Sequence, residues 1–295
     1  MRDDINLAPF TYRIVIGGVV VAEDNVSPDE VLAIDTGQAS GRLDGKPVKD
    51  PTFGLDALWI AQGDSDAATG LGYLVVDPGT VVATHLNQCL IQNASDLLGP
   101  DEVQALLDGL KERSAQLVAA LCPSPVPLTT LTQVLRGLLA ESIPLKEFRR
   151  IAAAIAVAAQ RTLDADELME LIRPELGPLI IQRLCGVREP LRVMTLEGQL
   201  EALLGQAVRS DPSKRHTIEP DLGRRIAEAL QRAAQPLIAE AKPFALVVQP
   251  SIRVAIRKLI KTVLPDTPVM SFFEVPEDKA VEVVAVIGAP EALPA

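Results

Sequence analysis

Residues 100–185 carry an almost unbroken helical pattern, and this constrains the fold more than any other feature of the chain. Four segments with helical spacing of apolar residues follow one another, separated by prolines, and acidic residues cluster at two of the starts, "PDE" and "DADE". Negative side chains in a first turn complement the helix dipole. We therefore predict an all-helical module in the middle of the chain.

The residues before this module include many β-branched side chains, and turn residues interrupt them. Three stretches predict short strands: 11–22, with a possible hairpin at Gly17-Gly18, 31–35 and 72–77. Residues 36–56 are rich in Gly, Pro and Asp, which favours turns and short extended pieces. A helix is predicted to begin at Pro78 and to end before Gly99.

After the module, strand and helix patterns alternate. A strand is predicted at 190–197, helices at 197–209 and 220–241, and then the segments "FALVVQP", "SIRVAIRKLIKTVL", "TPVMSFFEV" and "VEVVAVIG". This order is typical of a small α/β domain. The link 209–220, which contains His216, is polar, and we expect it to be mobile and exposed. The fold class is therefore α+β with several subdomains: a small mixed α/β pair, an all-helical middle module and a C-terminal α/β module.

The composition of the chain argues against some classes of function. The formal net charge of −11 lacks the basic surface that nucleic acid or anionic lipid requires, so we predict no nucleic-acid partner. The local basic runs 146–150 and 253–261 are interpreted as solvated helix faces. No segment has about 18 uninterrupted apolar residues and no signal peptide is evident, so we expect a soluble piece.

The inventory of reactive residues indicates a protein that is not an enzyme. The two histidines lie in different modules, and His85 in its apolar helix is expected to be a structural hydrogen-bonding residue. Phosphate-binding, nucleophile-elbow and metal-ligand patterns are absent, so we predict no cofactor and no metal. The three cysteines form no C-x-x-C pair and are expected to be buried thiols: Cys89, Cys122 and Cys185.

The stretch "DPTFGLDALWI" (50–60) holds Phe53 and Trp59, the only tryptophan, in a chain that is only 3% aromatic. Both rings could pack the core. Alternatively, an aromatic side chain beside a carboxylate and a hydroxyl is a common way to receive a partner's anchor. Composition leaves both interpretations open.

Five stretches together resemble the cytoplasmic domain of the type III secretion export-gate family, which has a flagellar and an injectisome branch. They are "RDDINLAPFTYRIVIGG", "DPTFGLDALWI", "GYLVVDPGTVVATHL", "LLGPDEVQALLDGL" and "LTQVLRGLLAESIPLKEFRRI". The resemblance covers essentially the whole chain and favours the flagellar branch. It implies four subdomains: 1–28 with 78–97, an inserted 29–77, the helical 98–189, and 190–295. The family's cytoplasmic part begins some tens of residues earlier, so subdomain 1 is expected to be incomplete at its N-terminus.

The resemblance also implies a function. Such a domain would be a docking platform on the cytosolic face of the bacterial inner membrane. It would bind chaperone–substrate complexes and other export-apparatus proteins, assemble as a ring of nine copies, and support ordered export and substrate-class switching without a cofactor. Its docking site, between the first two subdomains, falls on Asp50, Phe53 and Thr84. Asp56 stands where flagellar sequences often have proline, which changes the rim of that site.

Two other hypotheses stay open at this point. One is a small-molecule-binding regulatory or catalytic α/β protein whose site carries no recognisable motif. The other is an assembly scaffold in which ring contacts matter more than the docking site. Within the export-gate interpretation, we predict that Trp59 packs in the core and that Phe53 makes the contact.

Overall fold

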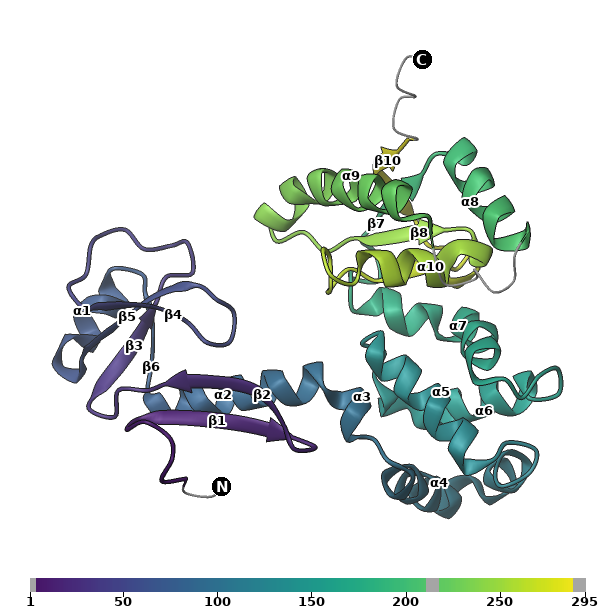
Figure 1. The fold of residues 1–295 in the computed structure, drawn as a ribbon, viewed down its shortest axis with the longest axis horizontal. Coiled ribbons are helices and arrows are strands. Elements are labelled where there is room, and N and C mark those ends of the chain that lie inside the picture. The colour runs from purple at the N-terminus through teal and green to yellow at the C-terminus, as the bar shows by residue number, and fades with distance from the viewer. Residues whose placement is uncertain (1–3, 211–217, 289–295) are drawn as a thin grey trace. The chain divides into compact units, whose positions relative to one another are not determined.

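The computed structural model describes residues 4–210 and 218–288, and it divides into two compact units, residues 1–103 and 104–295 (Figure 1). Each unit has its own sheet and its own apolar core. His216 and most of the link around it lie outside the described residues, so its expected exposure stays a prediction. The four-part subdomain division also stays a prediction.

The first unit contains a hairpin and a four-stranded sheet. Its strands are β1 (Thr11–Ile16), β2 (Val19–Asn25), β3 (Glu30–Ile34), β4 (Lys46–Lys49), β5 (Asp56–Ala61) and β6 (Leu74–Val76). The hairpin β1–β2 turns at Gly17 and Gly18, whose φ angles of 57° and 84° are those that a two-residue hairpin turn requires. The other strands are antiparallel in the order β4-β5-β3-β6. The predicted hairpin and strands are confirmed.

Four helical elements lie wholly in the first unit: η1 (Gln62–Asp64), α1 (Ser65–Gly70), α2 (Pro78–Gln92) and α3 (Ala94–Leu97). Asp77 caps α2 by accepting a hydrogen bond from the Thr80 backbone N–H at 2.9 Å, and Pro78 takes the first helical position. The helix ends earlier than predicted, because Asn93 leaves the helical conformation and its side chain donates to the Cys89 carbonyl. A separate short helix follows.

Both faces of the four-stranded sheet are buried, which explains the near-continuous apolar run of β3. Leu32 and Ile34 pack with Trp59 and with Val81 of α2 on one face. The alternate residues of β3 pack on the other face with Ala68 of α1. Trp59 is only 6% exposed, which confirms its predicted place in the core.

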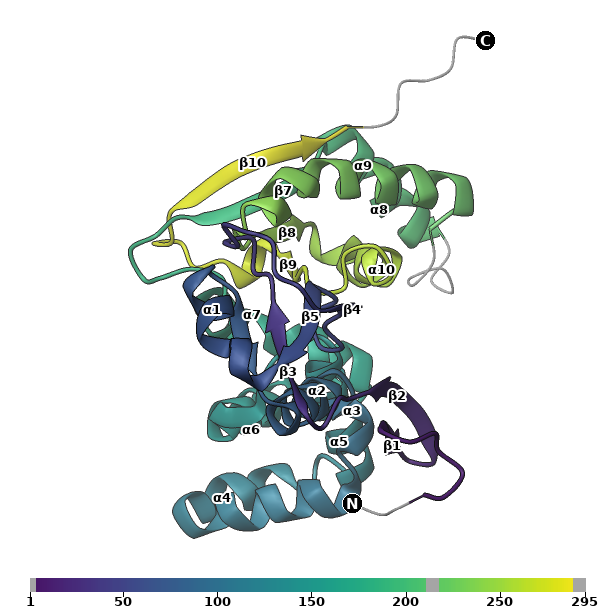
Figure 2. The ribbon, with the colours of Figure 1, turned by 90° about the vertical axis from the view of Figure 1, so that its left-hand side faces the viewer.

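The second unit begins with the predicted helices: α4 (Pro100–Leu121), α5 (Leu128–Ala140), η2 (Leu145–Glu147), α6 (Phe148–Ala158) and α7 (Ala165–Gln182). Its sheet is parallel, in the order β10-β7-β8-β9, with β7 (Leu191–Leu196), β8 (Ala245–Val248), β9 (Val269–Ser271) and β10 (Val281–Ile287). The remaining elements are α8 (Gly198–Ser210), α9 (Pro220–Ala239), α10 (Pro250–Ile260) and η4 (Phe272–Glu274). Figure 2 shows β10 running beside β7 at one edge of the sheet. The predicted α+β class is confirmed.

No helix among the described residues is long and apolar enough to cross a membrane.

Candidate functional site

The turn between β4 and β5 presents Phe53 to solvent. Asp50 organises this turn: its carboxylate Oδ2 accepts the Phe53 backbone N–H at 2.7 Å, and its own N–H donates to the Leu55 carbonyl at 2.8 Å. Gly54 adopts a φ of 68°, which favours glycine, and donates to the Asp50 carbonyl. The phenyl ring is 64% exposed, whereas Trp59, six residues later, is buried. The sequence therefore separates the two aromatic rings as predicted.

Asp50 itself is 4% exposed. Its carboxylate is engaged inside the turn, so the structure gives it the role of holding Phe53 in place. The resemblance placed the carboxylate of Asp50 at the docking site. It did not indicate that this carboxylate would form a hydrogen bond within the turn. The exposed carboxylate beside it is Asp56, which pairs with Lys49 at 2.7 Å across β4 and β5.

Thr84 lies on an exposed part of α2, one residue before the buried His85. Nδ1 of His85 and the Tyr12 hydroxyl are 2.7 Å apart, and the two rings meet edge to face. His85 is thus a structural hydrogen-bonding residue, as predicted. No hydrogen bond among the described residues joins Thr84 to Asp50 or Phe53.

Tyr12 of β1 contacts α2 through His85. Burial is the main cause that raises the pKa of the Tyr12 phenol, and negative charge from Asp24, Cys89 and Asp50 adds to it. No sequence pattern predicted the pairing of Tyr12 with His85, because a tyrosine in a strand and a histidine in a helix have no characteristic spacing.

Apolar side chains are also exposed in the turn and on α2. Leu55 is 39% exposed in the turn, and Leu86 and Leu90 of α2 are 41% and 39% exposed. Exposed leucines at i and i+4 form one stripe along a helix. The first unit therefore offers exposed leucines and an exposed phenylalanine in a hydrogen-bonded turn, which suits contact with a protein better than chemistry.

The described residues contain no group of His, Cys, Asp and Glu that could hold a metal ion. Cys89 is buried in α2, as expected. Cys122 and Cys185 are only half-buried and lie in turns just past the ends of α4 and α7, so the expectation of three buried helical thiols is wrong for these two.

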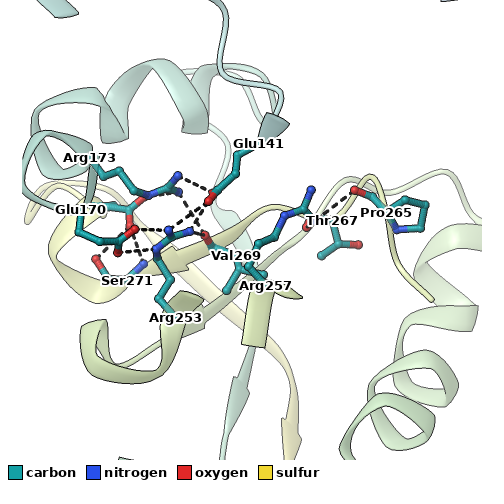
Figure 3. Close-up of polar contacts among 10 residues, drawn as sticks. Glu141, Glu170, Arg173, Arg253, Arg257, Pro265, Thr267, Val269 and Ser271 are labelled. Atoms are coloured by element: carbon teal, nitrogen blue, oxygen red, sulfur yellow. Dashed lines mark hydrogen bonds and ion pairs between the residues drawn. The ribbon is translucent and has the colours of Figure 1, made fainter. Parts of the chain in front are cut away.

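The second unit contains a buried cluster of charges instead (Figure 3). Arg253 is fully buried, and its guanidinium donates to Glu170 at 2.8 Å, to Glu141 at 2.8 and 3.1 Å and to the Val269 carbonyl at 3.3 Å. The interpretation of 253–261 as a solvated helix face is wrong at its first residue. A charge at that position of α10 faces inward because carboxylates from α7 and the end of α5 meet it there.

Arg173 of α7 completes this cluster. Its guanidinium donates to Glu141 at 2.6 Å and to Glu274 at 2.8 Å, and Glu274 also accepts the backbone N–H and the hydroxyl of Ser271. Burial alone would raise the pKa of Glu141, but the two arginines lower it overall. The cluster ties the helices to the end of β9.

A family model described as the FHIPEP family matches residues 1–280. The chain belongs to the FHIPEP family. Among curated proteins, it is 35% identical to the flagellar biosynthesis protein FlhA of Salmonella typhimurium over 288 residues, 98% of this chain and 41% of that protein. It is 31% identical to FlhA of Bacillus subtilis over 97% of the chain and 42% of that protein. This FHIPEP chain therefore spans about two fifths of the length of these relatives.

Solved structures of similar proteins show the same fold. The Chlamydia pneumoniae CdsV protein aligns with a TM-score of 0.80 at 20% identity, over 97% of this FHIPEP chain and 82% of that one. The nonameric EPEC SctV-C aligns with a TM-score of 0.74 at 20% identity, over 94% of this chain and 84% of that one. The predicted export-gate family is thus confirmed.

Proposed function

We propose that this chain is the cytosolic docking platform of a flagellar type III protein export gate, positioned at the cytosolic face of the inner membrane. The relatives support the flagellar branch, since the Salmonella typhimurium and Bacillus subtilis proteins both carry the name FlhA. The platform would bind chaperone–substrate complexes and support ordered export and the switch between substrate classes. We propose no enzymatic step.

The observation that carries this proposal is the braced presentation of Phe53. Phe53 is 64% exposed, and contact of its phenyl ring with water is unfavourable. Burial of the ring by a partner would therefore contribute favourably to the free energy of binding. The internal hydrogen bonds of the turn fix the ring before a partner arrives, which lowers the entropy cost of binding. We propose that Phe53 is the anchor, that Thr84 contributes a hydroxyl, and that Asp50 acts by holding the turn.

We also propose that the full-length protein assembles as a ring of nine copies and contacts other export-apparatus proteins. The support comes from proteins of the same fold: EPEC SctV-C is nonameric, and Chlamydia pneumoniae CdsV was solved in a complex with CdsO.

The test compares two exposed phenylalanines. Phe53→Ala should weaken binding of a purified flagellar chaperone–filament-subunit complex about tenfold or more, as truncation of an aromatic anchor does. Phe273→Ala is the matched control, because Phe273 is 66% exposed and lies in the other unit. It should bind as the wild type does. Equal binding by both variants, measured by calorimetry with folding confirmed by circular dichroism, would contradict the assignment of the site.

A further inference from the structure

The second unit carries a groove that the proposed docking site does not use. One hollow of about 210 Å³ is lined partly by Arg183 and Arg257, and a neighbouring hollow of about 410 Å³ is lined partly by Ile238 and Phe244. The two share four lining residues: Leu184, Pro265, Asp266 and Thr267. They therefore form one continuous depression, which we call the composite groove, with a cationic end and an apolar end.

Arg257 at the cationic end differs from the arginines of the buried cluster. Its Nη1 donates to the carbonyls of Pro265 and Thr267 at 3.2 and 3.3 Å, and Figure 3 shows it lying apart from Arg253, toward those two residues. No carboxylate within the described part of the chain forms an ion pair with it. Carbonyl oxygens hold the guanidinium in place but do not neutralise its charge.

The surroundings leave this charge uncompensated. Burial is the main cause that lowers the pKa of Arg257, and the neighbouring Arg253 lowers it further. Glu141 opposes the shift, but its carboxylate is already bonded to Arg173 and Arg253. Asp266 also lines the groove and opposes the shift without forming an ion pair. A partly buried cation that lacks a counter-ion favours an incoming anion.

Arg183 adds a second positive charge at the same end. It follows the last residue of α7, is exposed, and makes no side-chain hydrogen bond or ion pair with any described residue. Two carboxylates, Asp266 and Glu141, line the same hollow, but Glu141 is already bonded to the arginines of the buried cluster. The two guanidinium groups therefore face one carboxylate that forms no ion pair. Guanidinium groups bind carboxylates through two parallel hydrogen bonds, so this end matches an acidic side chain.

The other end of the composite groove is mainly apolar, and its one lysine, Lys242, pairs with Glu240. Leu237 and Ile238 from the end of α9, Phe244 before β8, and Val263 and Leu264 after α10 line it. Ile238 is 57% exposed, so a partner that covers it would remove apolar surface from water. A free inorganic anion would satisfy the arginines and leave this apolar half in water.

We propose that the composite groove binds a short acidic segment of a partner protein. An aspartate or glutamate of that segment pairs with Arg257 and Arg183, and its neighbouring apolar side chains cover Ile238 and the wall around it. The charge complementarity selects an acidic segment, and the adjoining apolar half selects a polypeptide over a small anion. This second docking site is distinct from the one at Phe53, which belongs to the other unit.

The test selects binders from a random library of 12-residue phage-displayed peptides on the whole 295-residue chain. We expect enriched peptides to carry Asp or Glu beside apolar residues. Arg183→Glu should weaken their binding at least about tenfold. Arg188→Glu is the matched control, because Arg188 is also exposed and unpaired among the described residues but does not line the groove, and it should bind as the wild type does.

A second pair of variants tests the apolar half. Ile238→Asp should weaken binding, whereas Leu203→Asp, at 55% exposure on α8, should not. Phe53→Ala should leave peptide binding unchanged, so this site can fail or succeed independently of the proposed chaperone site. The proposal is overturned if the library yields no acidic enrichment, or if the selected peptides bind Arg183→Glu as tightly as wild type. It is also overturned if inorganic phosphate binds at the arginines and Ile238→Asp has no effect on any ligand.

Discussion

The two units bury charge for different purposes. In the first unit, the carboxylate of Asp50 is buried inside a short turn, and its hydrogen bond to the Phe53 N–H holds the turn that exposes Phe53. In the second unit, Arg173 and Arg253 are hidden among carboxylates from separate helices, and the result is that those helices are joined to the sheet. A buried charge can therefore hold an exposed side chain in place in one region and stabilise the packing of helices in another.

The largest effect is expected from Arg253→Met. Removing this guanidinium leaves Glu141 and Glu170 without their main partner, and breaking a buried ion pair costs about 3–5 kcal/mol. The free energy of unfolding, followed by far-ultraviolet circular dichroism in urea, should fall by that amount. Arg224→Met, which breaks an exposed pair with Glu228, is the control and should change it by about 0.5 kcal/mol or less.

The fluorescence of the only tryptophan can follow the unfolding of the first unit separately. Trp59 lies in the first unit, so its fluorescence reports unfolding of that unit alone. We expect Arg253→Met to move the dichroism transition and to leave the Trp59 transition in place. An equal shift of both transitions would show that the cluster stabilises the whole chain and would break the contrast drawn between the units.

A smaller loss is expected from Gly177→Ala in α7. A Cβ at this position would lie 1.9 Å from the Glu274 carbonyl oxygen, so η4 would have to move and its pairing with Arg173 would weaken. Overpacking of this kind costs about 1–3 kcal/mol. Gly109→Ala is the control, because nothing lies near a Cβ there and the helix should gain about 0.5–1 kcal/mol. A stable Gly177→Ala variant would contradict the close packing of η4 on α7.

Asp50→Ala should have a smaller effect still on stability, about 1–2 kcal/mol, because one charged acceptor of a backbone N–H is lost. The Trp59 transition should shift and partner binding should fall, since Phe53 is no longer held. Asp50→Asn keeps an acceptor oxygen and should lose less of both. If Asp50→Ala lost binding while Asp50→Asn and wild type were equal in binding and in stability, the positioning role would be supported over a direct charge contact.

The sequence predicted most elements because each of them has a local cause. Apolar spacing predicted the helices of 100–185, and Gly17-Gly18 predicted the hairpin turn. The break of α2 at Asn93 was missed, since asparagine carries no strong stop signal within an apolar helical pattern. Arg253 was assigned to a solvated face because its partners lie 83 and 112 residues away in the chain. The pairing of Tyr12 with His85 likewise depends on a contact across 73 residues that no local pattern encodes.

The most direct test of the central claim is hydrogen–deuterium exchange of the whole chain with and without a flagellar chaperone–filament-subunit complex. The claim is that the braced turn of the first unit is the contact. Amides of residues 50–56 and of α2 around Thr84 should exchange more slowly in the complex. Residues 271–275 of the second unit, which include the exposed Phe272 and Phe273, should not change. Protection confined to residues 104–288, with 50–56 exchanging as in the free protein, would contradict the account.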